Sequence, residues 1–328
     1  MSNASTASIV MMRGYVPRMA LFVVGILALT LCQVALNRSL RGMDTSWVEP
    51  PDVGASKTDP RLFKAFTFGH WTVGVDWLWI RSLQEQELEH VPRGTHAPVY
   101  YAMDLATDLD PAFFEVYWAG TNYLAIVRDD VTGSLNLVEK GIQFIKQDLN
   151  NYPESFRENY WEGSWNLYLL LAYLKLFEFN NMLEAANAFQ EAASLPGSSK
   201  YLTTLARRLR APGGQYEVGI RLLSFMITGL KDTPAGRQSR KVLERKRSAL
   251  LVSQYLFLLN ENFHSYLQKI PGYRSKISLS AREMDRYWHK FVKETNAPMQ
   301  DPLGGQIKLD ASGRVESTTP QERVFGLE

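Results

Sequence analysis

The sequence predicts an all-α protein made of one N-terminal transmembrane helix, a repetitive helical body and a small C-terminal β-hairpin. Three observations support this fold class: an uncharged apolar run at residues 19–37, helical spacing of apolar residues from Arg61 onward, and alternation of polar and apolar residues confined to residues 296–328. Hydrophobic residues make up 45% of the chain and charged residues 21%, which excludes a wholly disordered protein.

The apolar run separates Arg18 from Arg38 by 19 uncharged residues, Met19 to Asn37. As a helix rising 1.5 Å per residue it would reach about 28 Å, close to the ~30 Å of a bilayer's hydrocarbon core. We therefore expect a short tail at 1–18 followed by a signal-anchor helix at 19–37. A cleaved signal peptide is the alternative, although no Ala-x-Ala pattern follows the run promptly.

The flanking charges leave the orientation of this helix open, because Arg13 and Arg18 on one side balance Arg38 and Arg41 on the other. A short tail before a first apolar helix resembles bacterial signal-anchor proteins. That resemblance implies a single-pass protein of the inner membrane with its soluble domain in the periplasm. Residues 38–60 contain three prolines after Trp47 and are expected to form a linker.

The body repeats one pattern of offsets on helices that end near a proline. The pattern starts with a small or apolar residue. An apolar residue follows four positions later, a small or variable residue seven positions later, and a helix breaker about twelve positions later. The four copies are Val99, Met103, Ala106 and Pro111; Gly141, Ile145, Asp148 and Pro153; Ala185, Phe189, Ala192 and Gly197, with Pro196 one position early; and Leu222, Met226, Gly229 and Pro234. The four prolines are 42, 43 and 38 residues apart.

This pattern resembles the second helix and terminating proline of tetratricopeptide repeats, with Ala185, Phe189 and Ala192 as the best copy. Gly120 and Tyr123 match the first helix of such a unit. The resemblance covers roughly residues 96–235, with a longer and less regular period than the family has. It implies an α-solenoid over 61–235, in which small residues let helices approach closely and a concave face binds protein partners.

Two further helices and a hairpin are expected after Pro234. Helices at 237–267 and 279–293, on either side of Pro271-Gly272, would cap the solenoid within residues 236–295. In the tail at 296–328, residues 306–309 and 314–317 flank a polar turn and read as two short strands. Because a lone hairpin is marginal in water, we expect it to dock on the helices or on a partner.

Several segments permit both a functional and a purely structural interpretation. Aromatic residues concentrate between Phe63 and Trp79 and could lie at a membrane interface, although a first core layer is favoured. The helix expected from Glu158 to Phe179 is apolar nearly all round from Gly163, but only 12 uncharged residues lie between Glu162 and Lys175, so it is predicted to be buried rather than membrane-spanning. The basic stretch Arg237–Arg247 could bind anionic lipid or a phosphorylated or acidic partner, but a solvated helix face is favoured.

No residue pattern identifies a reaction. Asp104, Asp108 and Asp110 are interpreted as turn and surface carboxylates, and the histidines form no pair with metal-ligand spacing. The single cysteine, Cys32, excludes an intramolecular disulfide, and a formal charge of +2 gives no reason to expect nucleic acid. The sequence therefore predicts no catalytic, cofactor-binding or metal-binding residue, no cofactor, and no enzyme.

The function expected from the anchor and the repeats is a membrane-anchored scaffold for protein–protein interaction in a bacterial envelope assembly. The alternative is an envelope enzyme or carrier that binds a lipid or glycan in a pocket lined by aromatic residues. The residues that would line it are Tyr100, Tyr101, Tyr117, Trp118, Tyr123, Tyr160, Trp161 and Trp165.

Overall fold

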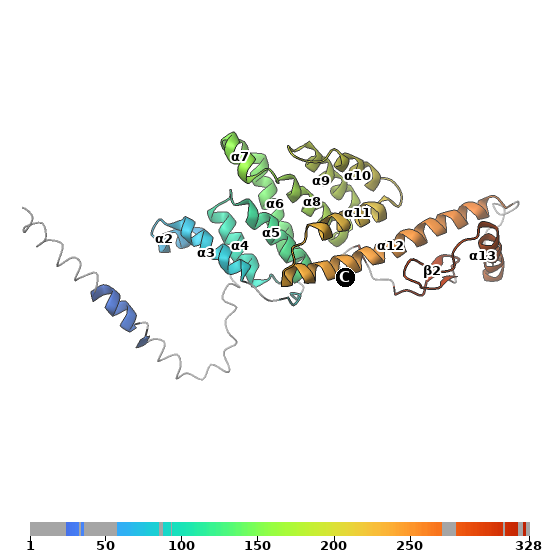
Figure 1. Cartoon of the computed structure of the whole chain (residues 1–328), viewed down its shortest axis with the longest axis horizontal. Coiled ribbons are helices and arrows are strands. Elements are labelled where there is room, and N and C mark those ends of the chain that lie inside the picture. The colour runs from blue at the N-terminus through green and yellow to red at the C-terminus, as the bar shows by residue number, and fades with distance from the viewer. Residues whose placement is uncertain are drawn as a thin grey trace, which may run out of the picture. The chain divides into compact units, whose positions relative to one another are not determined.

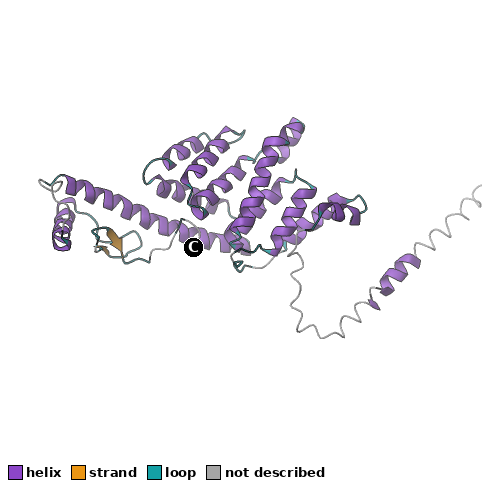
Figure 2. Cartoon of the chain, turned by 180° about the vertical axis from the view of Figure 1, so that it is seen from behind, coloured by secondary structure: helices purple, strands orange, loops and turns teal. Residues whose placement is uncertain are grey.

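The computed structural model is mostly helical, with one small antiparallel pair of strands (Figures 1 and 2). It describes residues 24–32, 34–35, 58–84, 88–92, 94–270, 280–310, 312–320 and 324–325. The chain divides into two compact units, Met1–Val53 and Gly54–Glu328.

In the first unit, residues 24–32 and 34–35 are helical, and their large apolar side chains are exposed. The rest of the predicted anchor at 19–37 lies outside the described residues, as do residues 1–18 and 38–57. Of the helices that the structure describes, none is both long enough and apolar enough to cross a membrane.

The second unit begins with helices that pack in successive pairs, from blue to olive in Figure 1. A short helix, α2 (Pro60–Phe66), precedes the pairs. The pairs are α3 (Trp71–Leu83) with α4 (Pro98–Leu109); α5 (Phe114–Asn122), extended by the π-helix η1 (Tyr123–Arg128), with α6 (Val131–Gln147); α8 (Trp165–Tyr173), extended by the π-helix η3 (Leu174–Glu178), with α9 (Met182–Ser194); and α10 (Tyr201–Leu209) with α11 (Gly214–Gly229). We call these four pairs the helical array.

Local sequence explains where several of these helices begin. The Asp130 side chain caps α6 by accepting a hydrogen bond from the backbone N–H of Gly133. The Asn181 side chain caps α9 by accepting one from the backbone N–H of Glu184. Thr233 caps the next long helix, whose first residue is Pro234. Before α6 and α9 the chain passes through a left-handed residue, Asp129 or Asn180, which ends the preceding π-helix segment and turns the chain back.

The region between α6 and α8 corrects one prediction. The helix expected from Glu158 to Phe179 is interrupted, because α7 (Glu154–Tyr160) ends before Trp161 and α8 starts only at Trp165. A 3₁₀ turn, η2 (Leu149–Asn151), precedes α7. The break places the Trp161 ring in the core, where its indole Nε1 donates to the Ala112 carbonyl at 2.9 Å. Burial of this large ring with its N–H satisfied explains the turn.

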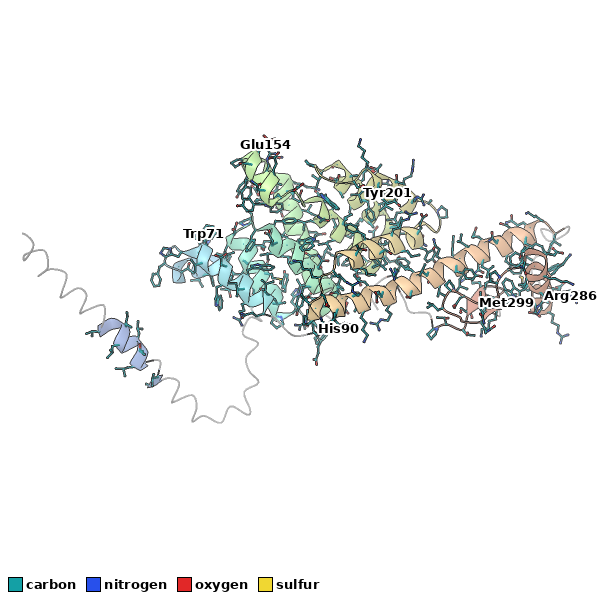
Figure 3. All side chains as sticks on the ribbon, in the orientation of Figure 1. Trp71, His90, Glu154, Tyr201, Arg286 and Met299 are labelled. Carbon is teal, nitrogen blue, oxygen red and sulfur yellow. The ribbon has the colours of Figure 1, made fainter. Side chains whose placement is uncertain are left out.

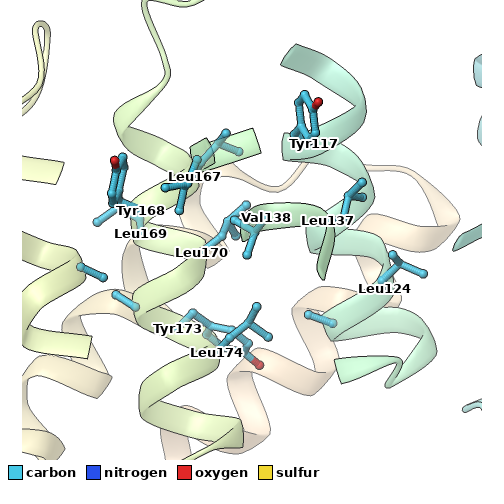
Figure 4. Close-up of a cluster of buried hydrophobic side chains, with 14 of the residues drawn as sticks. Tyr117, Leu124, Leu137, Val138, Leu167, Tyr168, Leu169, Leu170, Tyr173 and Leu174 are labelled. Carbon is cyan, nitrogen blue, oxygen red and sulfur yellow. The ribbon is translucent and has the colours of Figure 1, made fainter. Parts of the chain in front are cut away.

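Each copy of the repeated pattern lies on the second helix of one pair: α4, α6, α9 and α11. In the second and third copies the small residues permit close approach as expected, whereas in the fourth copy a Cβ on the exposed Gly229 would meet nothing within 4 Å. A Cβ on Gly141 would lie 2.8 Å from the Tyr117 ring and 2.9 Å from Leu167, so α6 contacts both α5 and α8 across this position. Ala185, Phe189 and Ala192 are fully buried on α9. Figure 4 shows the layer of leucine, valine and tyrosine side chains that joins α5 and α6 to α8.

After the array, α12 (Pro234–Gln268) runs for 35 residues and contributes to two separate hydrophobic clusters. Leu243 and Leu250 belong to the core of the array. Leu259, Phe263 and Leu267 form a second core with Trp288 and Phe291 of α13 (Ala281–Thr295). Figure 3 places Arg286 of α13 and Trp71 of α3 at opposite ends of this unit.

The predicted hairpin is present as β1 (Ile307–Leu309) and β2 (Val315–Ser317), paired antiparallel with Leu309 opposite Val315. It docks on helices of its own chain, because Ile307 and Val315 are buried in the second core. The side-chain amide of Asn260 on α12 donates to the Val315 carbonyl and accepts from the Val315 N–H at 2.8 Å. Beyond β2, Phe325 stacks on Phe177 of η3 at 5.6 Å, so the chain returns to the array.

Asp301 organises the turn that leads into β1. Its carboxylate accepts from the backbone N–H groups of Leu303 (2.7 Å) and Gly305 (3.0 Å) and from the hydroxyls of Ser317 and Thr319. Burial alone would raise the pKa of Asp301, but these hydrogen bonds outweigh it and hold the pKa below its ordinary value.

Acid is therefore expected to open the hairpin turn. A carboxylate with a lowered folded-state pKa stabilises the fold above its unfolded pKa of about 3.9, and this contribution is lost as the pH falls through the folded pKa. Hydrogen-exchange protection of the Leu303 and Gly305 amides should fall in that window, and Asp301→Asn should abolish the pH dependence. Undiminished protection of both amides in acid would show that the ionised carboxylate does not hold the turn.

Candidate functional site

The most unusual polar cluster of the described residues lies where α12 crosses the ends of the two π-helices. Lys246 of α12 reaches into the array and donates to Glu178 Oε1 at 2.7 Å and to the Tyr173 hydroxyl at 3.2 Å. We call Tyr173, Glu178 and Lys246 the buried triad. The Lys246 ammonium also lies 5.5 Å from the centroid of the Tyr173 ring.

The backbone of η3 places two members of this triad. Tyr173 ends α8 and Glu178 ends η3, one π-helical turn further on. η1 has the same position in the preceding pair and ends with another buried charged residue, Arg128, whose Nε donates to the Glu89 carbonyl at 2.9 Å. π-helical turns within α-helices occur frequently at functional sites.

The electrostatics of the triad favour a charged lysine beside a neutral tyrosine. Burial raises the pKa of the Tyr173 hydroxyl, so it stays protonated in the neutral range. For Lys246 burial alone would lower the pKa, but the negative charge of Glu178 and the hydrogen bonds to Glu178 and Tyr173 raise it. Because the Tyr173 hydroxyl and the Lys246 ammonium both keep their protons, the triad is suited to fixing α12 on the array rather than to transferring protons.

The prediction that the whole stretch Arg237–Arg247 is a solvated helix face is wrong for Lys246, whose side chain is only 25% exposed and paired with Glu178. Arg237, Lys241 and Arg245 are exposed as predicted. Lys246, however, shares a helix stripe with the buried Leu243 and Leu250, at spacings of three and four residues. The spacing of Lys246 from these two leucines was therefore the sequence signal that its side chain faces the array.

The acidic residues of α4 are engaged between two pairs of the array. Asp104 and Asp108 both bind Lys140 of α6, at 2.9 and 2.6 Å. Asp110 accepts from the Ala112 N–H in the turn after α4, as predicted. These carboxylates tie α4 to α6 and shape the intervening turn.

His96 is the histidine with the closest carboxylate partner among those described. Its Nδ1 lies 3.0 Å from Asp130, whose carboxylate also accepts from the Ala97 N–H and caps α6. The contact therefore holds the loop before α4 against the start of α6. Among the described residues, no group of three His, Cys, Asp or Glu side chains is placed to hold a metal ion.

Four of the aromatic residues proposed to line a pocket pack in two pairs, Tyr100 with Tyr101 and Tyr117 with Trp161. Tyr117 and Trp161 are fully buried with ring centroids 6.1 Å apart, and Trp161 also contacts Phe114 and Phe144. Trp118 and Tyr160 are exposed.

Of the hollows lined by described residues, two open ones lie elsewhere on the unit, and none of these eight aromatic residues lines either. The larger hollow, about 880 Å³, lies between α11, α12 and β2 and includes Tyr216, Phe257 and Arg314. The smaller, about 550 Å³, lies beside the start of α9 and the turn between α10 and α11.

The aromatic segment Phe63–Trp79 is divided between core and surface. Phe63, Trp71 and Trp79 are half-buried against the array, as expected for a first core layer. Phe68 and Trp77 are exposed. The side chain of Phe66 lies outside those described.

Comparisons with known proteins give no match. No family model matches the chain, and neither the search of curated proteins nor the search of solved structures found a match.

Proposed function

We propose that this chain is a membrane-anchored helical-repeat scaffold that binds protein partners. The observation that carries the proposal is the placement of the four pattern copies, one on the second helix of each successive pair. Stacked pairs of this kind bury a continuous core and leave an extended surface for partners, which is how solenoid proteins resembling tetratricopeptide repeats work. The concave face of such an array is the partner surface that we propose.

Exposed apolar side chains on successive pairs support a partner surface. Trp118 on α5, Leu183 on α9 and Phe225 on α11 each present a large apolar group to solvent. Aromatic and long aliphatic side chains of this type dominate the energy of protein–protein contacts. We do not assign a catalytic role to any residue.

The anchor in this proposal is residues 19–37. Its described part is helical, and Val24, Leu27, Leu29 and Leu31 are all exposed, as lipid-facing side chains would be. We further propose a single-pass protein of a bacterial inner membrane with the array in the periplasm.

Site-specific photocrosslinking in intact cells tests both halves of this proposal. A crosslinking amino acid at Trp118, Leu183 or Phe225 should give discrete protein adducts that fractionate with membranes and resist carbonate extraction. The matched control is Arg286 of α13, which is exposed but lies outside the array. The side of the membrane is read from the reaction of Ser312→Cys, in a Cys32→Ser chain, with an impermeant thiol reagent in spheroplasts.

Two results would count against the proposal. A full-length chain released by carbonate, or a soluble chain that begins after residue 37, would exclude the anchor. Equal adducts at Arg286 and at the three array positions would exclude a specific partner surface on the array.

A further inference from the structure

The outer face of α3 is apolar and uncovered. Val73, Trp77 and Ile80 follow one another at spacings of four and three residues and expose 65%, 53% and 53% of their surface. The opposite face of α3 buries Val75 and Leu78 against α4. Leu62 of α2 and Phe68, which is 90% exposed in the turn between α2 and α3, are further large apolar groups that face solvent. We call Val73, Trp77 and Ile80 the α3 face.

This face lies on the first pair of the array. In stacked repeats the terminal unit needs a polar outer surface to remain soluble, because no further unit covers it. Here the first pair instead presents apolar side chains, and contiguous exposed apolar patches on soluble domains mark contact sites.

We propose that the α3 face rests in the interfacial zone of the lipid bilayer, as a second membrane contact beside the anchor. This inference rests on the proposed membrane anchor. Tryptophan and phenylalanine favour this zone, and α3 has 13 residues, too few to span but enough to lie in the membrane plane.

The charges around the face fit the same occupant. Lys64 lies 5.5 Å from the centroid of the Trp71 ring, and Arg81 lies 5.5 Å from that of Trp77, so both cations lie beside aromatic rings. Long basic side chains can extend from such a position to anionic headgroups. Asp76 is exposed on the same helix, which suits a face at headgroup level rather than in the acyl region.

The chain length between the two contacts permits simultaneous binding. Residues 38–59 separate the apolar run from α2. At about 3 Å per residue this segment could reach about 65 Å. Its length therefore permits the first pair to lie on the membrane surface or away from it. The α3 face, rather than the linker, would then set the distance between the array and the membrane.

Lipid contact at α3 can be measured on the full-length chain in vesicles of phosphatidylcholine and phosphatidylglycerol. In a Cys32→Ser background, single cysteines at Val73, Phe225 and Leu29 carry an environment-sensitive fluorophore. Phe225 is the matched control, since it is an apolar residue on α11 that is 55% exposed, against 65% for Val73. We expect blue-shifted emission at Val73, with quenching by shallow brominated lipids several-fold stronger than at Phe225. Leu29 should be quenched by deep brominated lipids.

A second set of variants removes the face without touching the core. Trp77→Glu with Ile80→Glu should abolish lipid quenching at Val73, whereas Leu183→Glu on α9 should leave it unchanged. Circular dichroism should show the same helix content and melting for all three chains, because the altered side chains are exposed.

The outcomes separate this inference from the proposed anchor. Deep quenching at Leu29 with Val73 as solvent-exposed as Phe225 would overturn the α3 contact and leave the anchor in place. Loss of quenching at Leu29 itself would overturn the anchor. A label at Val73 that is protected from aqueous quencher but not reached by brominated lipid would mean that a protein, such as a second copy of this chain, covers the face, and the lipid proposal would fail.

Discussion

Replacing Phe189 with alanine is expected to lower the free energy of unfolding by about 3 to 5 kcal/mol. The side chain exposes 0% of its surface and belongs to the main core of the array. Removing the ring leaves a cavity that the backbone cannot close, because α9 packs on α8 on one side and on α10 on the other. Chemical denaturation followed by circular dichroism measures the change.

Phe225→Ala is the matched control, since it removes the same ring from an exposed position on α11. It should change the free energy of unfolding by less than about 1 kcal/mol. A loss below about 1 kcal/mol for Phe189→Ala as well would mean that this residue does not fill the space between the helices.

Replacing Lys246 with methionine is expected to cost about 3 to 5 kcal/mol, because it leaves the buried Glu178 carboxylate without its cation. Methionine keeps most of the side-chain volume, so the lost free energy of unfolding comes from the missing charge rather than from a cavity. The double variant Lys246→Met with Glu178→Leu removes both charges and should recover most of the stability. Equal losses in the single and the double variant would show that the ion pair does not fix α12.

The triad also predicts how stability falls in alkali. The pKa values of Lys246 and Tyr173 are both raised in the folded protein. Their contribution is therefore fully present below the unfolded pKa values of about 10, and it is lost as the pH rises through the higher folded values. In the double variant Lys246→Met with Glu178→Leu, stability should fall less in alkali, because the contribution of Lys246 is absent.

Much of the fold follows from local sequence. Pro234 after Thr233 marks the start of α12, and the Asp301–Gly305 turn and the two strands lie where polar and apolar residues alternate. Each copy of the repeated offsets lies on the second helix of a pair, and Gly141 stands where α6 approaches α5 and α8 closely.

The remaining features depend on tertiary contacts that one sequence does not encode locally. The break between α7 and α8 places the Trp161 ring between α5 and α6, a contact with Tyr117 and Phe144, which lie far from it in the sequence. The π-helical ends of α5 and α8 likewise carry no composition signal. Lys246 was assigned to the surface by its basic neighbours, although its register with Leu243 and Leu250 indicated burial.

The join between the array and the C-terminal hairpin is a helix and not a linker. At 1.5 Å per residue the 35 residues of α12 form a rod of about 52 Å, whose first half is held by the buried triad and whose second half carries α13 and the hairpin. The hairpin is therefore joined to the array at two places, by this rod and by Phe325, which stacks on Phe177 after β2. The Lys246–Glu178 ion pair and the packing of α12 on α11 fix the rod's end of this connection.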